Sequence, residues 1–283
     1  LAVLSMHTSP LAQPGTGDGG GLNVYVRELT SALARAGTTC DVYTRAFAPD
    51  VPAVVTVEPG LRVHHVAAGP LAAVAKEALP ELVEEFAAGV LTRMGQGYPA
   101  DTIHANYWLS GVAGHAIKHT LDVPLICTFH TLARVKSEAS EPEPERRAAA
   151  ETAVIGCSEV VVASCTAEAD QLIHLYGADP ERILILPPAV DHALFTPGDR
   201  RAARRAIGVA AKGSLALFVG RIQALKGVDV AVETLARLGR ADATLLVVGG
   251  PSGVDGEAHV GRIHRLVEAR GLAGRVRFVD PQP

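Results

Sequence analysis

The chain has 283 residues, of which 48% are hydrophobic and 20% are charged, a composition typical of a folded globular protein. Its formal net charge of -4 offers no electrostatic attraction to nucleic acid or to an acidic membrane surface, and no apolar run is long enough to span a bilayer. No basic segment precedes an apolar one at the start, as it would in a secretory signal, so we expect a cytoplasmic protein.

Short apolar runs alternate with amphipathic segments along the chain. This alternation predicts an α/β fold with a mostly parallel, doubly wound sheet that helices cover on both faces. The first strands are expected at Leu1–Leu4, Asp41–Thr44, Val54–Val57, Leu61–Val66, Asp101–His104, Val123–Thr128, Val160–Ala163 and Ile183–Leu186. The first helices are expected from Leu22 onward and over Leu79–Met94 and Ala167–Tyr176.

A second unit follows the proline-containing stretch Leu186–Asp191. Its expected helices are Arg200–Ile207, one from about Gly227 and Arg262–Arg270, and its expected strands are Leu215–Val219, Thr244–Val248 and Val276–Val279. We therefore predict an N-terminal domain over residues 1–190 and a partial C-terminal domain over residues 191–283. Three strands are too few for a complete doubly wound domain, and the chain begins inside a strand without Met, so we expect a fragment cut at both ends.

A glycine-rich loop, Gly15–Gly21, lies between the first strand and a helix. Bare glycines and the free N–H groups of a helix N-terminus favour a bound anion, so the loop predicts a phosphate or diphosphate site. Its spacing Gly15-x-Gly17-x-x-Gly20 also matches the dinucleotide fingerprint, which leaves a nicotinamide-dependent oxidoreductase as an alternative. However, Met6–Pro14 separates the loop from its strand, and Asp41 begins the next strand rather than ending it. A purely structural loop is the third interpretation.

Polar or aromatic residues follow three of the expected strands directly. They are His7, the run His104–Tyr107, and His130 with Thr131. In open parallel sheets, ligands bind beyond the carboxyl ends of the strands. Although each residue alone is more often an ordinary loop residue, three such clusters at one edge predict a shared cleft.

Two arginines, Arg146 and Arg147, open a predicted helix, a position where the helix dipole favours acidic residues. The fork of an arginine binds phosphate oxygens well, so a nearby anion is one explanation and a solvated basic patch is the other. The preceding acid-proline run, Glu141–Glu145, is interpreted as an exposed loop.

Two further cations, Arg221 and Lys226, lie on one loop at the carboxyl end of an expected strand. This arrangement suits a diphosphate leaving group whose negative charge must be stabilised. The loop lacks the Walker pattern, so it is not a P-loop.

The four cysteines lie far apart and contain no C-x-x-C pair, so we interpret them as buried free thiols: Cys40, Cys127, Cys157 and Cys165. His115 and His119 are four residues apart on an expected helix and could bind a metal. No carboxylate completes the set locally, so no metal site is predicted from these residues.

Several runs resemble the retaining GT-B glycosyltransferases of family 4, and the similarity extends along the whole chain. They are HTSPLAQPGTGDGGGLNVYV, NYWLSG, HTLARVK, YGADPERI, PGDRRAAR, FVGRIQALKG and VVGGPSG. The resemblance implies two Rossmann-like domains facing across a cleft, the second truncated here. It is greatest to the branch that transfers N-acetylglucosamine from UDP-GlcNAc to 1D-myo-inositol 3-phosphate in mycothiol biosynthesis.

The resemblance implies roles for matching positions. The donor would be bound by Gln13, Pro14, Asp18, Gly19, Gly20, Gly21, Leu22, Asn23, Arg221 and Lys226. The phosphorylated acceptor would be bound by His7, Asn23, Lys76, Tyr107, Thr131 and Arg147. His130 would contact the transferred sugar, and Arg221 and Lys226 would neutralise the departing diphosphate.

Two departures from the pattern keep other acceptors open, such as fructose 6-phosphate or a lipid-linked sugar. Leu22 stands where the inositol enzymes commonly have Met, and local similarity is weaker around Lys76. The resemblance implies no cofactor within this chain. Magnesium ligands and the glutamates for the donor would lie beyond Pro283, so the fragment alone is expected to be inactive. A homodimer is one option for its assembly, and a non-catalytic binding module is the reading if the gene ends at Pro283.

Overall fold

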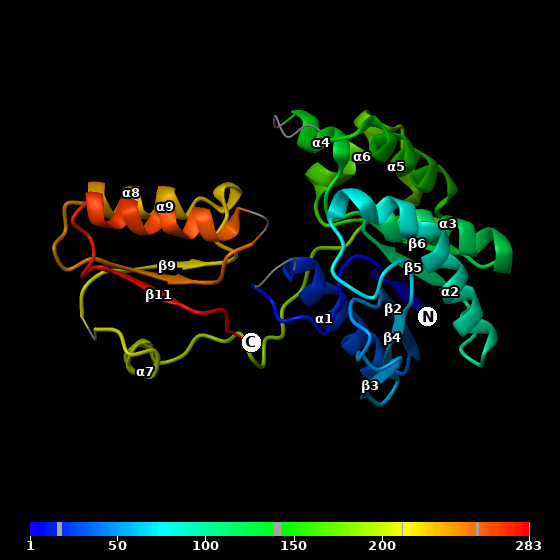
Figure 1. The fold of residues 1–283 in the computed structure, drawn as a ribbon, viewed down its shortest axis with the longest axis horizontal. Coiled ribbons are helices and arrows are strands. Elements are labelled where there is room, and N and C mark those ends of the chain that lie inside the picture. Colours follow the sequence, from blue (N-terminus) through cyan, green and yellow to red (C-terminus); the bar gives the residue numbers. More distant parts are fainter. Residues whose placement is uncertain (16–18, 139–142, 211, 253–254, 283) are drawn as a thin grey trace. The chain divides into compact units, whose positions relative to one another are not determined.

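The computed structural model describes residues 1–283 except 16–18, 139–142, 211, 253–254 and 283 (Figure 1). The chain forms two compact units. Unit 1 contains Leu1–Leu11 and Leu22–Pro188, and unit 2 contains Ala12–Gly21 and Ala189–Pro283. The glycine loop therefore groups by its contacts with the C-terminal part of the chain.

Unit 1 is built on one eight-stranded sheet with the spatial order β3-β4-β2-β1-β5-β6-β7-β8. Its strands are β1 (Ala2–Leu4), β2 (Cys40–Arg45), β3 (Val54–Glu58), β4 (Leu61–Val66), β5 (Ile103–Asn106), β6 (Leu125–Thr128), β7 (Val160–Ala163) and β8 (Ile183–Ile185). The β3–β4 hairpin is antiparallel and the other pairings are parallel. The strands predicted for the first domain, and the mostly parallel sheet, are thus confirmed.

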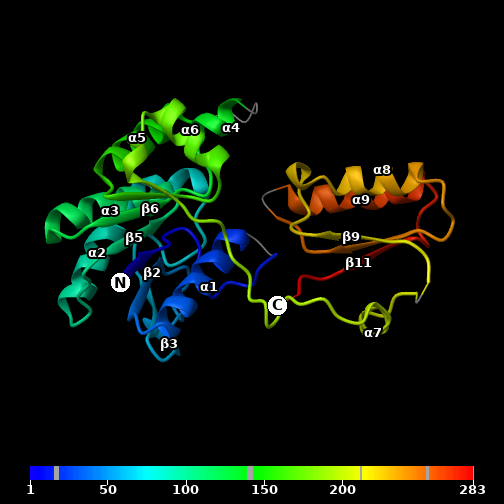
Figure 2. The ribbon, with the colours of Figure 1, turned by 180° about the vertical axis from the view of Figure 1, so that it is seen from behind.

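Helices cover both faces of this sheet, as Figures 1 and 2 show. They are α1 (Gly21–Arg35), η1 (Lys76–Leu82), α2 (Val83–Gly95), α3 (Trp108–Leu121), α4 (Ala133–Glu138), α5 (Glu145–Cys157), α6 (Thr166–Tyr176) and η2 (Pro180–Arg182). Ala2 and Leu4 belong to a core shared with α2, α3, α5 and α6. Val3 belongs to a separate core that contains Val26 of α1. Successive side chains of a strand point to opposite faces, so α1 lies on one face and the larger helical layer on the other.

Several expected boundaries in unit 1 differ from the structure, and two of them have a clear physical reason. The helix expected from Leu79 begins only at Val83, and a 3-10 segment containing Pro80 precedes it. Proline lacks the N–H that an α-helical hydrogen bond requires, which explains the tighter geometry there. The strand expected to end at His104 continues to Asn106, because Asn106 pairs with Thr128 of β6.

Unit 2 contains a three-stranded parallel sheet with the order β11-β10-β9. Its elements are α7 (Arg200–Ala206), β9 (Leu215–Val219), η3 (Ala224–Lys226), α8 (Val228–Arg237), β10 (Thr244–Val248), α9 (Gly256–Ala269) and β11 (Val276–Val279). Figures 1 and 2 show α8 and α9 on the same side of this sheet, where they share its apolar core. The predicted strands are confirmed, but α9 begins at Gly256 rather than at Arg262.

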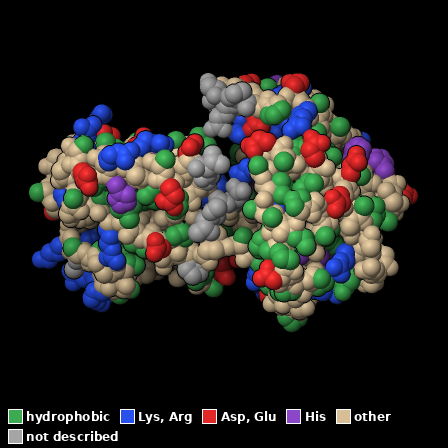
Figure 3. Space-filling view, viewed as in Figure 1, with side chains coloured by type: hydrophobic (Ala, Val, Ile, Leu, Met, Phe, Trp, Pro, Cys, Tyr) green, Lys and Arg blue, Asp and Glu red, His purple; other side chains and the backbone are tan. Residues whose placement is uncertain are grey.

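Acidic and basic side chains are interspersed over the face of unit 1 seen in Figure 3, which fits the small net charge of the chain. Within the described residues, no helix has both the length and the apolar character needed to cross a bilayer.

Candidate functional site

The loops predicted to bind ligands follow three adjacent strands of unit 1. β1, β5 and β6 are neighbours and run parallel, so their carboxyl ends meet at one edge of the sheet. From β1 the chain continues outward on one side to β2, whereas β5 lies on the other side. This reversal makes the β1/β5 border the topological switch point, the place where open α/β sheets bind their ligands.

Four of the six predicted acceptor residues are in contact at this edge. The rings of His7 and Tyr107 have centroids 4.5 Å apart, and the Arg147 guanidinium lies 5.1 Å from the centroid of Tyr107. Nη2 of Arg147 donates hydrogen bonds of 3.0 and 3.1 Å to the carbonyl oxygen and Oγ1 of Thr131. The arginine also lies 5.9 Å from the ring centroid of Trp108, so its plane is held between aromatic groups.

Two residues at this edge have positive φ angles, a conformation that side chains other than glycine rarely adopt. Tyr107 has φ 75° and His130 has φ 61°. The Tyr107 N–H donates to the carbonyl oxygen of Thr128 at 2.8 Å, which anchors the turn between β5 and α3. Such conformations cost about 1–3 kcal/mol each and cluster at functional sites.

Two carboxylates, the buried Glu151 and the partly buried Glu143, hold Arg147, which is only 3% exposed. Its Nε donates to Oε1 of Glu151 at 2.8 Å, and its Nη1 lies 3.0 Å from Oε1 of Glu143. Burial opposes the charge of Arg147, but Tyr107, Glu151 and Glu143 outweigh it and raise its pKa. Arg146, the alternative from sequence, is instead exposed and pairs at 3.4 Å with Glu81.

The acid-proline run was interpreted as an exposed loop, and its described residues Pro144 and Glu145 are exposed whereas Glu143 is partly buried. The side chain of Glu143 is 14% exposed and forms ion pairs with both Arg147 and Lys136. Burial alone would raise the pKa of Glu143, but these two cations lower it below its usual value. The spacing of four residues that joins Glu143, Arg147 and Glu151 was visible in the sequence and is typical of ion pairs on one helical face. Residues 139–142 of the run lie outside the described residues.

Glu151 also supports the neighbouring loop. Its side chain is fully buried, and its Oε2 accepts hydrogen bonds from the backbone N–H of Ala133 at 2.9 Å and from the hydroxyl of Tyr176. This contact joins Tyr176 of α6 to Glu151 of α5, so the local sequence around Tyr176 did not predict it.

A second polar cluster surrounds His130. Nε2 of His130 lies 3.0 Å from Oδ1 of Asn106, and its ring meets the edge of Tyr25 with centroids 4.9 Å apart. Burial lowers the pKa of His130 to about 4. Burial, reinforced by His130, also lowers the pKa of His104 to about 4, and Nε2 of His104 lies 2.8 Å from Oγ1 of Thr128. Both imidazoles are therefore neutral at neutral pH.

Asn106 has a polar atom available for a ligand. Its Nδ2 is buried and has no hydrogen-bond partner among the residues that the structure describes. A buried donor without a protein partner is unusual in folded proteins, so this atom is a candidate contact for a bound acceptor. The sequence placed Asn106 in a cluster after β5 but did not single it out.

Two predicted residues differ from the others in their surroundings. Asn23 is buried, and its Nδ2 donates to Oγ1 of Thr8 at 2.6 Å and to the carbonyl oxygen of Ser9 at 2.5 Å, so it supports the loop after β1. Lys76 is exposed at the first residue of η1. The next residue, Glu77, accepts a hydrogen bond of 3.2 Å from Arg146, which brings η1 beside the start of α5.

Unit 2 carries its own cationic group. Nη1 of Arg221 donates to Oγ of Ser252 at 3.3 Å. A methyl group placed on Gly20 would lie 3.6 Å from Nε of Arg221, so the glycine loop passes directly beside this guanidinium. The loop is joined to Gly250, the second residue after β10, by a hydrogen bond of 3.3 Å from the Gly250 N–H to the carbonyl oxygen of Gly15. Lys226 is exposed at the end of η3.

The remaining predicted donor residues lie along the same loop. Gln13 and Gly21 are exposed, Pro14 is half-buried, Gly19 is buried, and Leu22 packs against the core beneath α1. Asp18 lies outside the described residues, as does Gly17 of the dinucleotide fingerprint.

Asp41, the acidic residue considered for a dinucleotide ribose, has a structural role. Its carboxylate accepts hydrogen bonds of 2.7 and 2.8 Å from Arg62 and lies 2.7 Å from Nε2 of His64. These partners occupy both oxygens of a buried group, which weakens the nicotinamide alternative.

One cluster of potential metal ligands lies within the part of the chain that the structure describes. Its three side chains have ligand atoms close enough to share an ion, namely His115, His119 and Cys157. Magnesium requires oxygen ligands, so this nitrogen and sulfur set does not fit it.

Family models match both parts of the chain. Residues 20–189 match the glycosyl transferase 4-like domain, and residues 199–283 match glycosyl transferases group 1. The chain therefore belongs to the glycosyltransferase family that carries these two domains, and it is an enzyme of the GT-B fold class.

Similar proteins agree with this assignment. The chain is 45% identical to a D-inositol 3-phosphate glycosyltransferase of Actinosynnema mirum, over 100% of the chain and 70% of that protein. It is 46% identical to the protein of the same name from Geodermatophilus obscurus, over 99% of the chain and 65% of that protein. The chain thus spans about two thirds of the length of these relatives.

Solved structures show the same fold. A sucrose-phosphate synthase from Thermosynechococcus elongatus superposes with a TM-score of 0.91 at 30% identity, covering 99% of the chain and 70% of that protein. Anabaena HepE in complex with UDP-glucose superposes with a TM-score of 0.72 at 17% identity, covering 100% of the chain and 69% of that protein.

Proposed function

We propose that this protein transfers N-acetylglucosamine from UDP-GlcNAc to 1D-myo-inositol 3-phosphate, the reaction of mycothiol biosynthesis. The names of relatives that are 45% and 46% identical support the acceptor. The structure of HepE with UDP-glucose supports a UDP-sugar as the donor class. The observation that carries the proposal within this chain is the pair of cations, Lys136 and Arg147, that holds the Glu143 carboxylate at the switch point.

A carboxylate between two cations marks a position that favours an anion. The acceptor phosphate would take this position, displacing Glu143 and binding to Arg147, Lys136 and the hydroxyl of Thr131. Tyr107 and His7 would pack against the inositol ring, whose axial C–H groups suit an aromatic face. Lys76 would reach the same phosphate from η1 if its long side chain turned toward the start of α5.

The reaction needs no covalent enzyme intermediate. The bond between the anomeric carbon and the diphosphate oxygen breaks, and a bond forms from the acceptor hydroxyl oxygen on the same face, which retains the configuration. The hydroxyl proton passes to the departing phosphate oxygen. Arg221 and Lys226 would stabilise the diphosphate charge, while His130, neutral and held by Asn106, would contact the sugar. Any magnesium would be bound by residues outside this chain.

The first test is an acceptor panel with the full gene product and UDP-GlcNAc. Inositol 3-phosphate is expected to be used, whereas unphosphorylated inositol should lose at least about tenfold in kcat/KM because it forms no ion pairs with Lys136 and Arg147. Equal use of the two acceptors would contradict the phosphate site. UDP-glucose in place of UDP-GlcNAc tests the donor sugar.

A second acceptor, fructose 6-phosphate, is favoured by the similarity to a sucrose-phosphate synthase. It carries the same phosphate group but a different ring. Turnover of fructose 6-phosphate without turnover of inositol phosphate would replace the first proposal with this one.

The variant Arg147→Lys tests the phosphate contact. Lysine keeps the charge beside buried Glu151 but loses the two-pronged fork, so KM for inositol 3-phosphate is expected to rise by roughly tenfold or more. Arg146→Lys is the matched control at an exposed neighbour and should leave KM unchanged. Equal KM values in both variants would exclude Arg147 from acceptor binding.

The variant Glu143→Gln distinguishes two roles of that carboxylate. If the acceptor phosphate displaces Glu143, loss of its charge should lower KM for the acceptor. A raised KM would instead show that Glu143 orients Arg147 for the substrate and is not displaced.

A further inference from the structure

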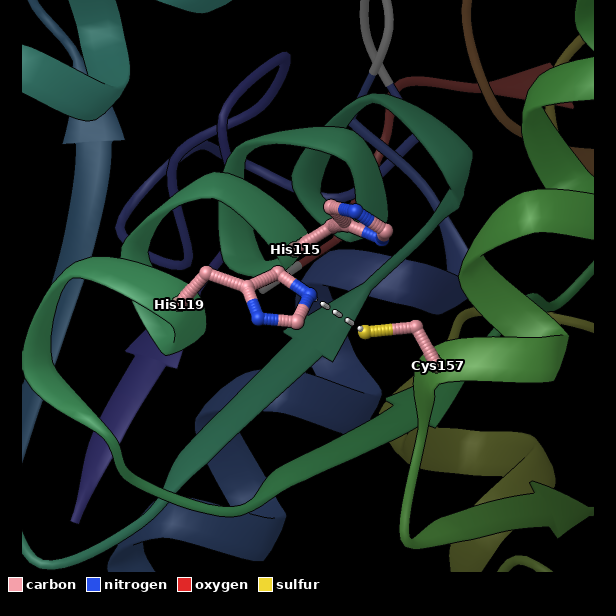
Figure 4. A group of neighbouring side chains, drawn as sticks. All are labelled: His115, His119 and Cys157. Carbon is pink, nitrogen blue, oxygen red and sulfur yellow. Dashed lines mark hydrogen bonds between the residues drawn. The ribbon is translucent and has the colours of Figure 1, made fainter.

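The C-terminal parts of α3 and α5 bring three metal-binding side chains together in unit 1. His115 and His119 lie one turn apart on α3, and Cys157 is the last residue of α5. One ligand atom from each lies within 4.8 Å of the other two. Figure 4 shows Nε2 of His119 directed at Sγ of Cys157, at 3.4 Å, with the ring of His115 beside them.

We propose that His115, His119 and Cys157 bind one zinc-class divalent ion that links α3 to α5. Two imidazoles and one thiolate form a ligand set that zinc prefers, and two histidines at i, i+4 share one helical face. Tetrahedral zinc with ordinary bond lengths places a nitrogen and a sulfur ligand about 3.6 Å apart. The observed 3.4 Å is close to that separation, so small side-chain rotations suffice.

The imidazole of His115 has a free coordinating atom. Its Nδ1 is buried and has no hydrogen-bond partner within the described part of the chain.

The nearby cation, Lys118, does not oppose an ion at this site strongly, because the carboxylate of Glu159 already pairs with it. Nζ of Lys118 donates to the carbonyl oxygen of Cys157 and forms an ion pair with Glu159. The carboxylate of Glu159 also accepts a hydrogen bond of 2.6 Å from the N–H of Leu125. The backbone around the cysteine is thus fixed to α3 and to the start of β6.

The helices that carry the ligands are packed together along their length. Gly111 of α3 faces Val154 of α5 so closely that a methyl group on Gly111 would lie 3.0 Å from Val154 Cγ1. A site on two packed helices needs little ordering when it binds a metal.

The proposed metal site lies at the edge of the sheet opposite to the one that carries the proposed acceptor residues of unit 1. α3 and α5 end just before β6 and β7 begin, whereas Tyr107 and Glu145 stand at their other ends. Three protein ligands leave one tetrahedral position for water. Because α5 also carries Arg147, the ion would stabilise the helix that holds the acceptor site without touching the substrate.

Cobalt(II) is the probe that tests the site, because a thiolate ligand gives it a charge-transfer band in the near ultraviolet. The full chain, reduced with a phosphine and freed of metal, is titrated with cobalt and then with zinc. One equivalent of cobalt is expected to produce the thiolate band and tetrahedral visible bands, and zinc is expected to abolish them. Absence of the thiolate band would overturn the proposal.

Substitutions assign the ligands. Cys157→Ser should remove the thiolate band, and His115→Gln or His119→Gln should weaken zinc affinity by at least about tenfold. Cys165→Ser and His174→Gln, exposed residues outside the cluster, are the matched controls and should bind as the parent does. Circular dichroism of each apo variant verifies folding. A band that survives Cys157→Ser, or is lost in Cys165→Ser, would place the metal elsewhere.

Discussion

At the scale of single residues, the acceptor edge combines buried ion pairs with two neutral histidines. Glu151 and Arg147 are both almost fully buried, and each satisfies the other. Breaking such a pair by removing one partner costs about 3–5 kcal/mol, so variants there must preserve charge to keep the fold intact. This is why Arg147→Lys is a better probe of binding than Arg147→Ala.

The two histidines predict a pH dependence of stability. Burial lowers the pKa of both His104 and His130 to about 4, whereas an unfolded histidine titrates near its ordinary value of about 6.5. Between these values the unfolded state binds more protons, so the free energy of unfolding should fall as pH decreases from about 6.5 to 4. Each histidine contributes at most roughly 3 kcal/mol.

Urea unfolding at several pH values in this window measures the effect. His104→Gln should flatten the dependence on pH, while His174→Gln, exposed on α6, should not. Identical slopes for His104→Gln and the parent would contradict the buried, neutral state of His104.

At the scale of elements, the strands were predictable because each is a short apolar run between polar or glycine-containing segments. The wrongly predicted boundaries have two kinds of cause, the local sequence and the pairing of strands. Pro80 delays α2, and the pairing with β6 extends β5 through Asn106. The start of α9 at Gly256 was missed because its first turns are polar and lack apolar periodicity.

The strand ends of unit 2 supply a prediction about Gly249. It follows β10 with φ 149°, and a methyl group there would lie 1.9 Å from the carbonyl oxygen of Gly220. Gly249→Ala should therefore lower the free energy of unfolding of unit 2 by at least about 2 kcal/mol. Gly274→Ala, at a glycine with open space around it, is the matched control.

Two signals separate the units in that experiment. The single tryptophan, Trp108, lies in unit 1, so its fluorescence reports on unit 1, whereas far-ultraviolet circular dichroism reports on both units. Gly249→Ala is expected to shift part of the dichroism transition and to leave the fluorescence transition in place. If Gly274→Ala shifted the dichroism transition as much as Gly249→Ala does, strain at Gly249 would not be the cause of the shift.

At the scale of the whole molecule, the residues assigned to the proposed transfer belong to different units. The acceptor residues belong to unit 1, whereas Arg221, Lys226 and the glycine loop belong to unit 2. In the full gene product, Arg221→Ala or Lys226→Ala is expected to lower kcat by about 10²–10³, by analogy with lost oxyanion donors. Arg237→Ala, exposed at the end of α8, should leave kcat unchanged. An unchanged kcat in Arg221→Ala would remove this residue from catalysis.

The sequence by itself determined the fold class, the order of the strands along the chain, the family and the edge of the sheet where we propose that ligands bind. These follow from local apolar patterns, from turn residues and from motifs that are contiguous in the chain. Only the tertiary structure decided which polar groups share a site. The contact of Arg147 with Tyr107, the contact of Asn106 with His130 and the contact of Cys157 with His119 depend on how α3, α5 and the strand ends pack. Packing brings together residues that are far apart in the sequence, and local sequence patterns do not show which of them will come into contact.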